Sequence, residues 1–324
     1  MRPLRDESEL TTLCSHRPDA EAWRRMITHG LGTGLNRLEW CWLAEEAGEV
    51  TAALAWWAPI GATHPHMLDL LATPDPTAAV ELITHSRRAL DIPTAECNVV
   101  TPDDTTPDPV IPDILRAAGF TPAVDRVRVE WTPTSPLATR SGEQPQKLSP
   151  IHPAGPSPVS KRRTRPRTPL ELRQARHVDE DTLMTLFAQV GDGTLDHHSS
   201  RARATRGRTA EAADRLHKCF AYPGDPTWFT IGFTPDGHPA GYVVPALIDG
   251  DHPVLAEIGV AQPFRGQGHV DHLLTTGTRA LTTAGATRVH SDTDQANHPM
   301  RAAFARAGYR EFATRRDYAW TRPH

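Results

Sequence analysis

Apolar and polar residues follow one another along the chain in two similar series of elements. In the first series, a helical period at residues 19–28 precedes β-rich segments at 41–44 and 52–58, which a turn at Gly48 joins. The same order recurs later, at residues 179–189, 228–231 and 240–246. Each series then has a short helix-like segment before a β-rich one, at 114–120 and 124–131 and at 304–309 and 315–320. The repeated order predicts a duplicated α/β fold.

Residues 132–169 separate the two series and have neither a helical nor a strand period. Proline, serine and threonine dominate this segment, so it cannot bury enough apolar surface to offset the entropy of ordering. We therefore expect domains at 1–131 and 170–324, joined by a flexible linker at 132–169. Its basic cluster, Lys161–Arg167, is either a docking site for nucleic acid, phosphate or an acidic protein or, as we prefer, part of a solvated tether.

Composition narrows the class of protein. The net charge of −4 gives no reason to expect nucleic acid as a partner. No apolar run reaches the length of about 18 residues that suggests a membrane span, and the first residues contain acids where a signal peptide needs an apolar core. Cys14, Cys41, Cys97 and Cys219 are scattered without a C-x-x-C pair. We expect a reduced, cytoplasmic protein.

A glycine loop in the second series is the strongest chemical signal. In the segment Leu255–Val260, apolar and other residues alternate as in a strand. Arg265-Gly266-Gln267-Gly268 follows, and helix-like sequence comes after it. At a helix N-terminus the first N–H groups have no internal partner and the dipole is positive, which favours an anion such as a diphosphate. Glycine lets the backbone approach a phosphate, and Arg265 adds a donor fork. The loop is neither a Walker loop nor a G-x-G-x-x-G fingerprint.

The sequence after the loop adds a second motif. A helical run to about Ala284 leads to a strand expected at 287–290, and Asn297 and Gly308-Tyr309 follow. In these residues the chain resembles the GNAT-family N-acetyltransferases. Arg265 and Gly268 match the first and fourth positions of that family's diphosphate loop, and Asn297, Gly308 and Tyr309 match its second motif. The resemblance covers roughly residues 170–320.

This resemblance implies two GNAT-like domains, each an α/β domain with a mixed, splayed β-sheet flanked by helices. It also implies an acyl-CoA co-substrate, such as acetyl-CoA, and transfer of the acyl group to an amine. The residues expected at the acyl-CoA site are Ile258, Val260, Arg265, Gly266, Gln267, Gly268, His269, Val270, Asn297 and Phe304. Among these, the backbone N–H of Val260 is expected to meet the oxyanion. Two positions depart from the family: Val270 stands where Gly or Ala is usual, and Phe304 where many members carry a general-acid tyrosine.

Candidate catalytic groups surround this loop. Glu257 lies on the strand face opposite Ile258, and in the family this strand often carries the base; a structural ion pair is the alternative. Asp292 and Asp294, expected after the next strand, could bind the acceptor ammonium or act as base, or could cap a turn. For the acid, Tyr318 is the candidate, since Tyr309 matches a core position.

The first series lacks the loop chemistry. Its counterpart at residues 70–76 contains no glycine, two prolines without N–H groups, and an aspartate that would repel phosphate. We therefore expect a degenerate N-terminal domain that does not bind acyl-CoA.

Other classes of function have weaker support. The paired histidines His197-His198 and His269/His272 have no cysteine or carboxylate at metal-ligand spacing, so we expect no metal. The acceptor is expected to be a small-molecule or protein amine, and the protein a monomer or homodimer. The main alternative, suggested by Phe304 and Val270, is a non-catalytic acyl-CoA-binding or regulatory protein.

Overall fold

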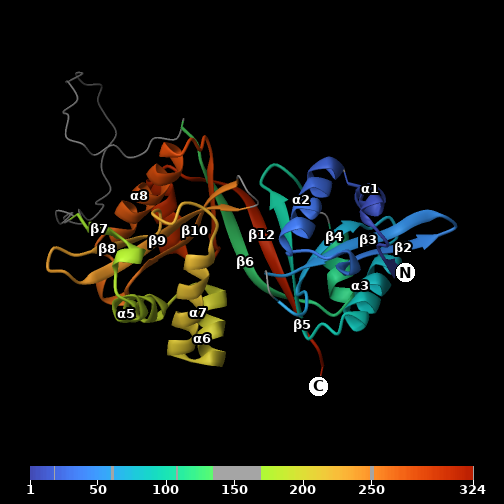
Figure 1. The fold of residues 1–324 in the computed structure, drawn as a ribbon, viewed down its shortest axis with the longest axis horizontal. Helices are drawn as coiled ribbons and strands as arrows, with labels where there is room; N and C mark the ends of the chain where they lie inside the picture. Colours follow the sequence, from blue (N-terminus) through green and yellow to red (C-terminus); the bar gives the residue numbers. More distant parts are fainter. Residues whose placement is uncertain (18, 60–61, 107–108, 134–168, 249–251, 324) are drawn as a thin grey trace, which may run out of the picture. The chain divides into compact units, whose positions relative to one another are not determined.

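The computed structural model describes residues 1–17, 19–59, 62–106, 109–133, 169–248 and 252–323, which form two compact units (Figure 1). Unit 1 comprises Met1–Arg128, Asp292–Ala296 and Glu311–His324, and unit 2 comprises Val129–Ser291 and Asn297–Arg310. Nearly all of the expected linker, including its basic cluster, lies outside the described residues.

Strands and helices alternate along both units. The strands are β1 (Arg2–Pro3), β2 (Cys41–Glu46), β3 (Glu49–Trp57), β4 (Met67–Ala72), β5 (Thr94–Pro102), β6 (Thr121–Trp131), β7 (Glu171–Gln174), β8 (Thr230–Phe233), β9 (Pro239–Ile248), β10 (His252–Val260), β11 (Val289–Asp294) and β12 (Arg310–Thr321). The helices are α1 (Leu10–Cys14), α2 (Ala20–Thr33), α3 (Pro76–Ala89), α4 (Val110–Ala117), α5 (Glu180–Gly191), α6 (His197–Arg206), α7 (Arg208–Ala221), α8 (His269–Thr283) and α9 (His298–Arg306). None of these helices is long and apolar enough to cross a membrane.

The helix and hairpin predicted for each series are confirmed. In the first, they are α2 and the antiparallel pair β2–β3. In the second, they are α5 and the antiparallel pair β8–β9. Asp179 explains the start of α5, because its side chain accepts a hydrogen bond from the backbone N–H of Thr182 and so satisfies one of the helix's unpaired donors.

Unit 1 is completed by the last strand of the chain. Its strands follow the order β1-β2-β3-β4-β5-β12-β6, and β12 pairs antiparallel with β5 from Ala313 to Thr321 (Figure 1). Tyr318 of this strand is fully buried in the core of unit 1, and the Arg87 guanidinium lies 3.7 Å from the ring centroid of Trp320. The expected domain boundaries differ here: residues 311–324, expected in the second domain, belong to unit 1 because β12 covers an otherwise open edge of β5.

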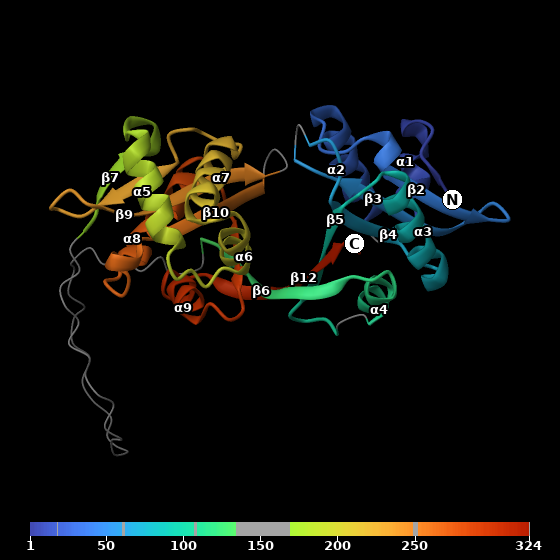
Figure 2. The same cartoon turned by 90° about the horizontal axis from the view of Figure 1, so that it is seen from below.

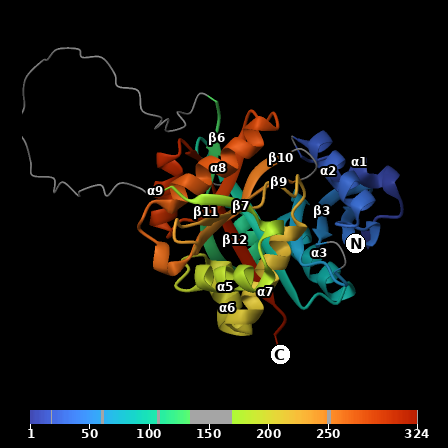
Figure 3. The same ribbon diagram turned by 60° about the vertical axis from the view of Figure 1, so that its left-hand side comes forward.

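Unit 2 contains α5–α9 and a sheet in the order β11-β10-β9-β8-β7, of which β11 contributes only its first residues. Helix α8 packs against β9 and β10, where Gly277 lies against Val243 and Leu255 (Figure 3). Helices α5 and α7 lie side by side, and α5 packs on the opposite face of the same strands, where Val190 approaches Gly259 (Figure 2). The strands β9 and β10 are therefore covered on both faces.

Candidate functional site

Strand β10 presents free backbone groups near its end. In the part of the chain that the structure describes, β10 pairs with β11 at one position, Val254 opposite His290. Further along β10, the N–H of Ala261 donates to a β9 carbonyl at 2.8 Å. Because N–H direction alternates along a strand, the N–H groups of Ile258 and Val260 point away from β9. They can therefore bind a ligand at this edge of β10, as expected for these two residues.

A β-bulge determines where the side chain of Glu257 points. The register of β10 on β9 shifts between Leu255 and Glu257, so one extra residue stands between them. After the shift, Glu257 lies opposite Val244, and its side chain shares a face with Gly259. This face carries α5 and α7, whereas Leu255 faces α8. The bulge thus turns the carboxylate toward α7.

The glycine loop presents free backbone donors. Gly266 and Gly268 have φ values of 76° and 83°, a left-handed conformation that favours glycine. Gly268 is the N-cap of α8 and offers no side-chain cap. Among the described residues, no turn, loop or cap hydrogen bond takes the N–H of Gly266, Gln267, Gly268, His269 or Val270. These N–H groups converge at a helix N-terminus and fit a diphosphate.

Nearby charges do not oppose an anion at this loop. Asp271 lies in the first turn of α8, but Arg306 of α9 holds its carboxylate at 2.8 Å. His269 is buried, and burial lowers its pKa below the ordinary histidine value. The ring is therefore neutral near pH 7 and contributes through its backbone N–H.

The side chain of Arg265 has other hydrogen-bond partners than the expected phosphate. Its Nε donates to the Val260 carbonyl at 3.1 Å, Nη1 to Gly193 at 3.0 Å and Nη2 to Val190 at 2.8 Å. The side chain therefore connects the glycine loop to the end of α5 and the turn after it. This corrects the expectation of a donor fork on phosphate: the guanidinium is held by backbone carbonyls, and the loop's N–H groups remain for the anion.

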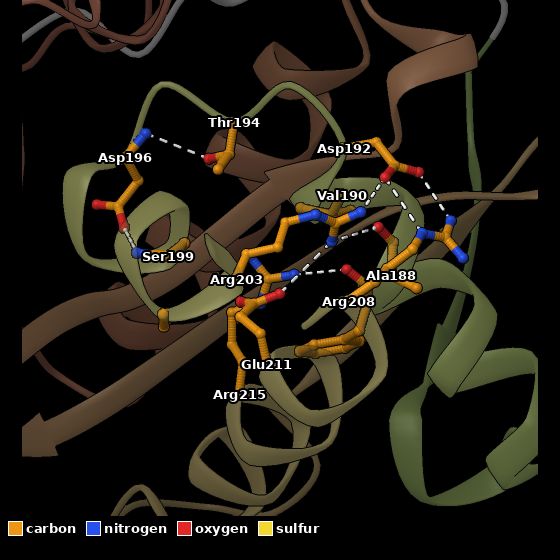
Figure 4. A network of polar contacts seen from close by, with 12 residues as sticks. Ala188, Val190, Asp192, Thr194, Asp196, Ser199, Arg203, Arg208, Glu211 and Arg215 are labelled. Atoms are coloured by element: carbon orange, nitrogen blue, oxygen red, sulfur yellow. Dashed lines mark hydrogen bonds and ion pairs between the residues drawn. The ribbon is translucent and has the colours of Figure 1, made fainter. Parts of the chain in front are cut away.

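Two further arginines hold the same end of α5 (Figure 4). Arg215 of α7 donates to the Phe187 carbonyl, and Arg203 of α6 donates to the Ala188 carbonyl. The last four carbonyls of a helix have no internal partner, so Arg203 satisfies one of them at Ala188. A Cβ at Gly191 would lie 2.6 Å from Arg203 Nη1, so a larger residue here would displace this guanidinium. Asp192 also pairs with Arg203 and with Arg208.

Glu257 contacts α7 directly. Lys218 of α7 places its Nζ 3.2 Å from Oε1 of Glu257. The same ammonium lies 5.4 Å from the ring centroid of Tyr222, which is half-buried at the end of the helix. Burial and the Glu257 carboxylate raise the pKa of Tyr222 above the ordinary phenol value. The phenol is therefore protonated at neutral pH.

A polar stripe on α7 explains this arrangement. Glu211, Arg215, Lys218 and Tyr222 are spaced at i, i+4, i+7 and i+11, so they share one helix face. Glu211 and Arg215 are buried and pair with each other at 3.3 Å. The sequence analysis did not identify Lys218 and Tyr222 as residues of the site. The helical spacing of polar residues on α7 could have indicated them, but it does not indicate that Glu257 lies opposite.

The remaining catalytic candidates do not gather at this site. Asp292 is on β11, not after it, and belongs to unit 1, where Arg128 and Arg315 hold its two oxygens at 3.2 and 2.6 Å. Asp294 is also on this strand and is buried, 3.5 Å from Arg126. These ion pairs correct the expectation that Asp292 acts as base or caps a turn, because its carboxylate is occupied by two guanidinium groups.

Tyr318 is corrected for a different reason. It belongs to unit 1 and is 0% exposed in a cluster of apolar side chains, opposite Cys97 of β5. Glu257 and the glycine loop belong to unit 2. A phenol enclosed in the core of the other unit has no access to substrate, so it is not assigned as the acid.

Two positions of the second motif have local structural roles. Asn297 is the N-cap of α9, where its side chain accepts a hydrogen bond from the Met300 N–H at 3.3 Å. Phe304 is 1% exposed, with its ring edge against Tyr309 at 5.1 Å between centroids. The ring of Phe304 therefore packs in the core of unit 2, and its expected place at the acyl-CoA site stays a prediction.

Unit 1 has a counterpart of the glycine loop whose helix end is already occupied. Asp75 caps α3, and its carboxylate accepts hydrogen bonds from the N–H groups of Thr77 at 2.8 Å and Ala78 at 3.3 Å. Pro76 at the first helical position has no N–H to offer. The chain's own carboxylate thus takes the donors that an external phosphate would need.

Comparison with known proteins agrees with this architecture. The sequence pattern of the Acetyltransferase (GNAT) family matches residues 195–309. A GCN5-related N-acetyltransferase from Sphaerobacter thermophilus is similar in structure, with a TM-score of 0.58 and 15% identity over 99% of this chain and 95% of that one. A tandem GNAT protein from the clavulanic acid biosynthesis pathway is also similar, with a TM-score of 0.57 and 17% identity over 100% and 98%. No curated protein matches the sequence.

Residues 195–309 match the GNAT acetyltransferase family, and over its whole length the chain has the fold of tandem GNAT proteins. The expected fold class is thereby confirmed.

Proposed function

We propose that unit 2 binds an acyl-CoA, such as acetyl-CoA, and transfers its acyl group to an amine by direct attack in a ternary complex. The observation that carries this proposal is the set of free N–H groups from Gly266 to Val270 at the start of α8. It is supported by the course of β10, which pairs with β11 at Val254 and beyond that point directs the N–H groups of Ile258 and Val260 away from β9. One group of donors suits a diphosphate and the other suits a thioester arm.

Deprotonation of the acceptor is assigned to Glu257. An alkylammonium with a pKa of about 10.4 is almost wholly protonated at neutral pH, so it must lose a proton before it attacks. Glu257 takes this proton directly or through water. The amine nitrogen then bonds to the thioester carbon, and the N–H of Val260 stabilises the oxyanion that forms. The C–S bond breaks, and the CoA thiolate leaves.

Tyr222 is the phenol best suited to protonate that thiolate. Of the chain's four tyrosines, Tyr242, Tyr309 and Tyr318 are at most 4% exposed, and Tyr309 hydrogen-bonds to a threonine hydroxyl. Tyr222 is half-buried beside Lys218, which reaches Glu257. Its raised pKa keeps the proton on the phenol until a thiolate forms.

The experiment is a thiol-release screen of the full chain with acetyl-CoA and a panel of amines, read beside CoA binding by calorimetry. Amine-dependent release of one thiol for each amide formed supports the proposal. Release that is independent of amine identifies hydrolysis and contradicts it.

The alternative function is acyl-CoA binding without catalysis, which the phenylalanine at position 304 favours because α9 presents no phenol there. Tight CoA binding without thiol release for any amine, small or peptide-linked, supports this alternative. Tyr222→Phe separates the two further, because it lowers turnover only if the phenol takes part in catalysis.

A further inference from the structure

The ion pair between Lys218 and Glu257 lies at the border of the solvent. The Lys218 side chain is 61% exposed, whereas that of Glu257 is 22% exposed. Ion pairs with an exposed partner contribute little to stability, so Lys218 can move aside at small cost. The acceptor ammonium needs the same carboxylate and must therefore displace the lysine.

The surroundings of this pair already suit an alkylammonium. The Lys218 Nζ lies between the Glu257 carboxylate at 3.2 Å and the Tyr222 ring at 5.4 Å. A carboxylate and an aromatic face both attract an ammonium group. The lysine thus marks the position that an acceptor amine takes when it approaches the base.

The buried charges on α7 have partners on α7 and on α6. Arg215 and Glu211 are buried and pair with each other, and Arg203 lies 3.8 Å from Glu211. A ligand at the helix surface therefore meets the ion pair of Lys218 with Glu257. When the two separate, opposite charges on the ligand can replace each partner.

We propose that the acceptor is an amine with a carboxylate one or two carbons away, as in a free amino acid or the terminus of a peptide-like acid. The inference rests on the acyltransferase function proposed above. The ammonium group of the acceptor binds Glu257, and the carboxylate of the acceptor binds the displaced Lys218, so that two ion pairs replace one. An amine without the carboxylate leaves Lys218 uncompensated, and a polyamine adds positive charge beside it.

The test compares acceptors in matched sets of three: an amino acid, its carboxamide and its decarboxylated amine. Sets built on glycine, leucine, phenylalanine and glutamine cover different side chains. With wild-type protein and acetyl-CoA, kcat/KM for the acid is expected to exceed that for both counterparts without the carboxylate by about tenfold or more in at least one set, because they lack the charged partner of Lys218.

Variants then assign the preference to Lys218. Lys218→Met is expected to lower the ratio of acid to decarboxylated amine at least tenfold, Lys218→Glu to reverse it, and Lys218→Arg to keep most of it. His217→Gln, an exposed neighbour on another face of α7, is the matched control and should keep the wild-type ratio. CoA affinity, measured by calorimetry, verifies that each variant is folded.

The outcomes distinguish this inference from the proposed function. Equal or faster transfer to the decarboxylated amines overturns the acceptor assignment while acyl transfer stands. An acid preference that survives Lys218→Met also overturns it. Thiol release with protein amines alone also overturns the acceptor assignment. If no amine causes thiol release, the proposed acyltransferase function itself is overturned.

Discussion

Arg265 Nη2 donates to the Val190 carbonyl oxygen at 2.8 Å, which links the glycine loop to the last turn of α5. The same guanidinium reaches the carbonyls of Gly193 and Val260. The conformation of the loop and the position of α5 are therefore coupled through one side chain. In this protein, the arginine of the diphosphate motif supports the loop from the protein side.

This relationship makes a prediction for Arg265→Met. The change leaves three backbone carbonyls without their donor. Water can replace the exposed bonds to Val260 and Gly193, but the bond to Val190 is partly buried, and a buried polar group without a partner costs about 1–3 kcal/mol. Urea unfolding should show a clear loss of stability, while the Kd for CoA rises by no more than about tenfold. A loss of CoA affinity of 100-fold or more at unchanged stability would assign the side chain to the phosphate instead.

Gly266→Ala tests the loop conformation. An added Cβ at this position meets nothing within 4 Å, but φ of 76° is strained for alanine. The loop should relax, misalign its N–H groups and weaken CoA binding by about tenfold or more. Gly285→Ala is the matched control, since it also has a positive φ, 98°, and open space around its Cβ, but lies after α8. Calorimetry should find wild-type affinity there. Equal weakening in both variants would point to general destabilisation.

Glu257→Gln tests the base. Glutamine keeps the size of the side chain but cannot accept the ammonium proton, so turnover should fall by about 10²-fold or more while the Kd for CoA stays within threefold. A variant with turnover within threefold of the wild type would show that another group takes the proton.

The pH dependence of stability should include His272. Its Nδ1 accepts a hydrogen bond from the Leu170 N–H at 3.1 Å, and burial together with Arg279 lowers its pKa. Since the unfolded residue titrates near pH 6.5, the unfolded chain binds more protons as pH falls through that value, so stability is lost on acidification. NMR titration should give a pKa for His272 below 6.5, and His272→Asn should flatten the stability curve between about pH 5 and 7. A pKa at or above 6.5 contradicts this assignment.

Local patterns in the sequence predicted the elements but not their partners. The period at 179–189 and the hairpin at 228–246 depend on neighbouring residues, and α5, β8 and β9 form there. The pairing of β12 with β5 joins segments more than 200 residues apart along the chain, and nothing local to Tyr318 indicates it. For the same reason, the role expected for this tyrosine needed correction.

The candidate site shows the same limit. The glycine loop was predicted because consecutive residues set its conformation. The contacts of Arg265 with Val190 and of Glu257 with Lys218 depend on the packing of α5 and α7 against β10, and the bulge before Glu257 is required for the second contact. Spacing along the sequence specifies neither.

The most direct measurement is a calorimetric titration of the full chain with acetyl-CoA. Only unit 2 presents free N–H groups at its loop, whereas Asp75 occupies the equivalent donors in unit 1, so we predict one site per chain. Gly268→Val should abolish this binding, and Asp75→Asn should leave it at one site. Absence of binding in the wild-type chain, two sites per chain, or one site that survives Gly268→Val would contradict the account.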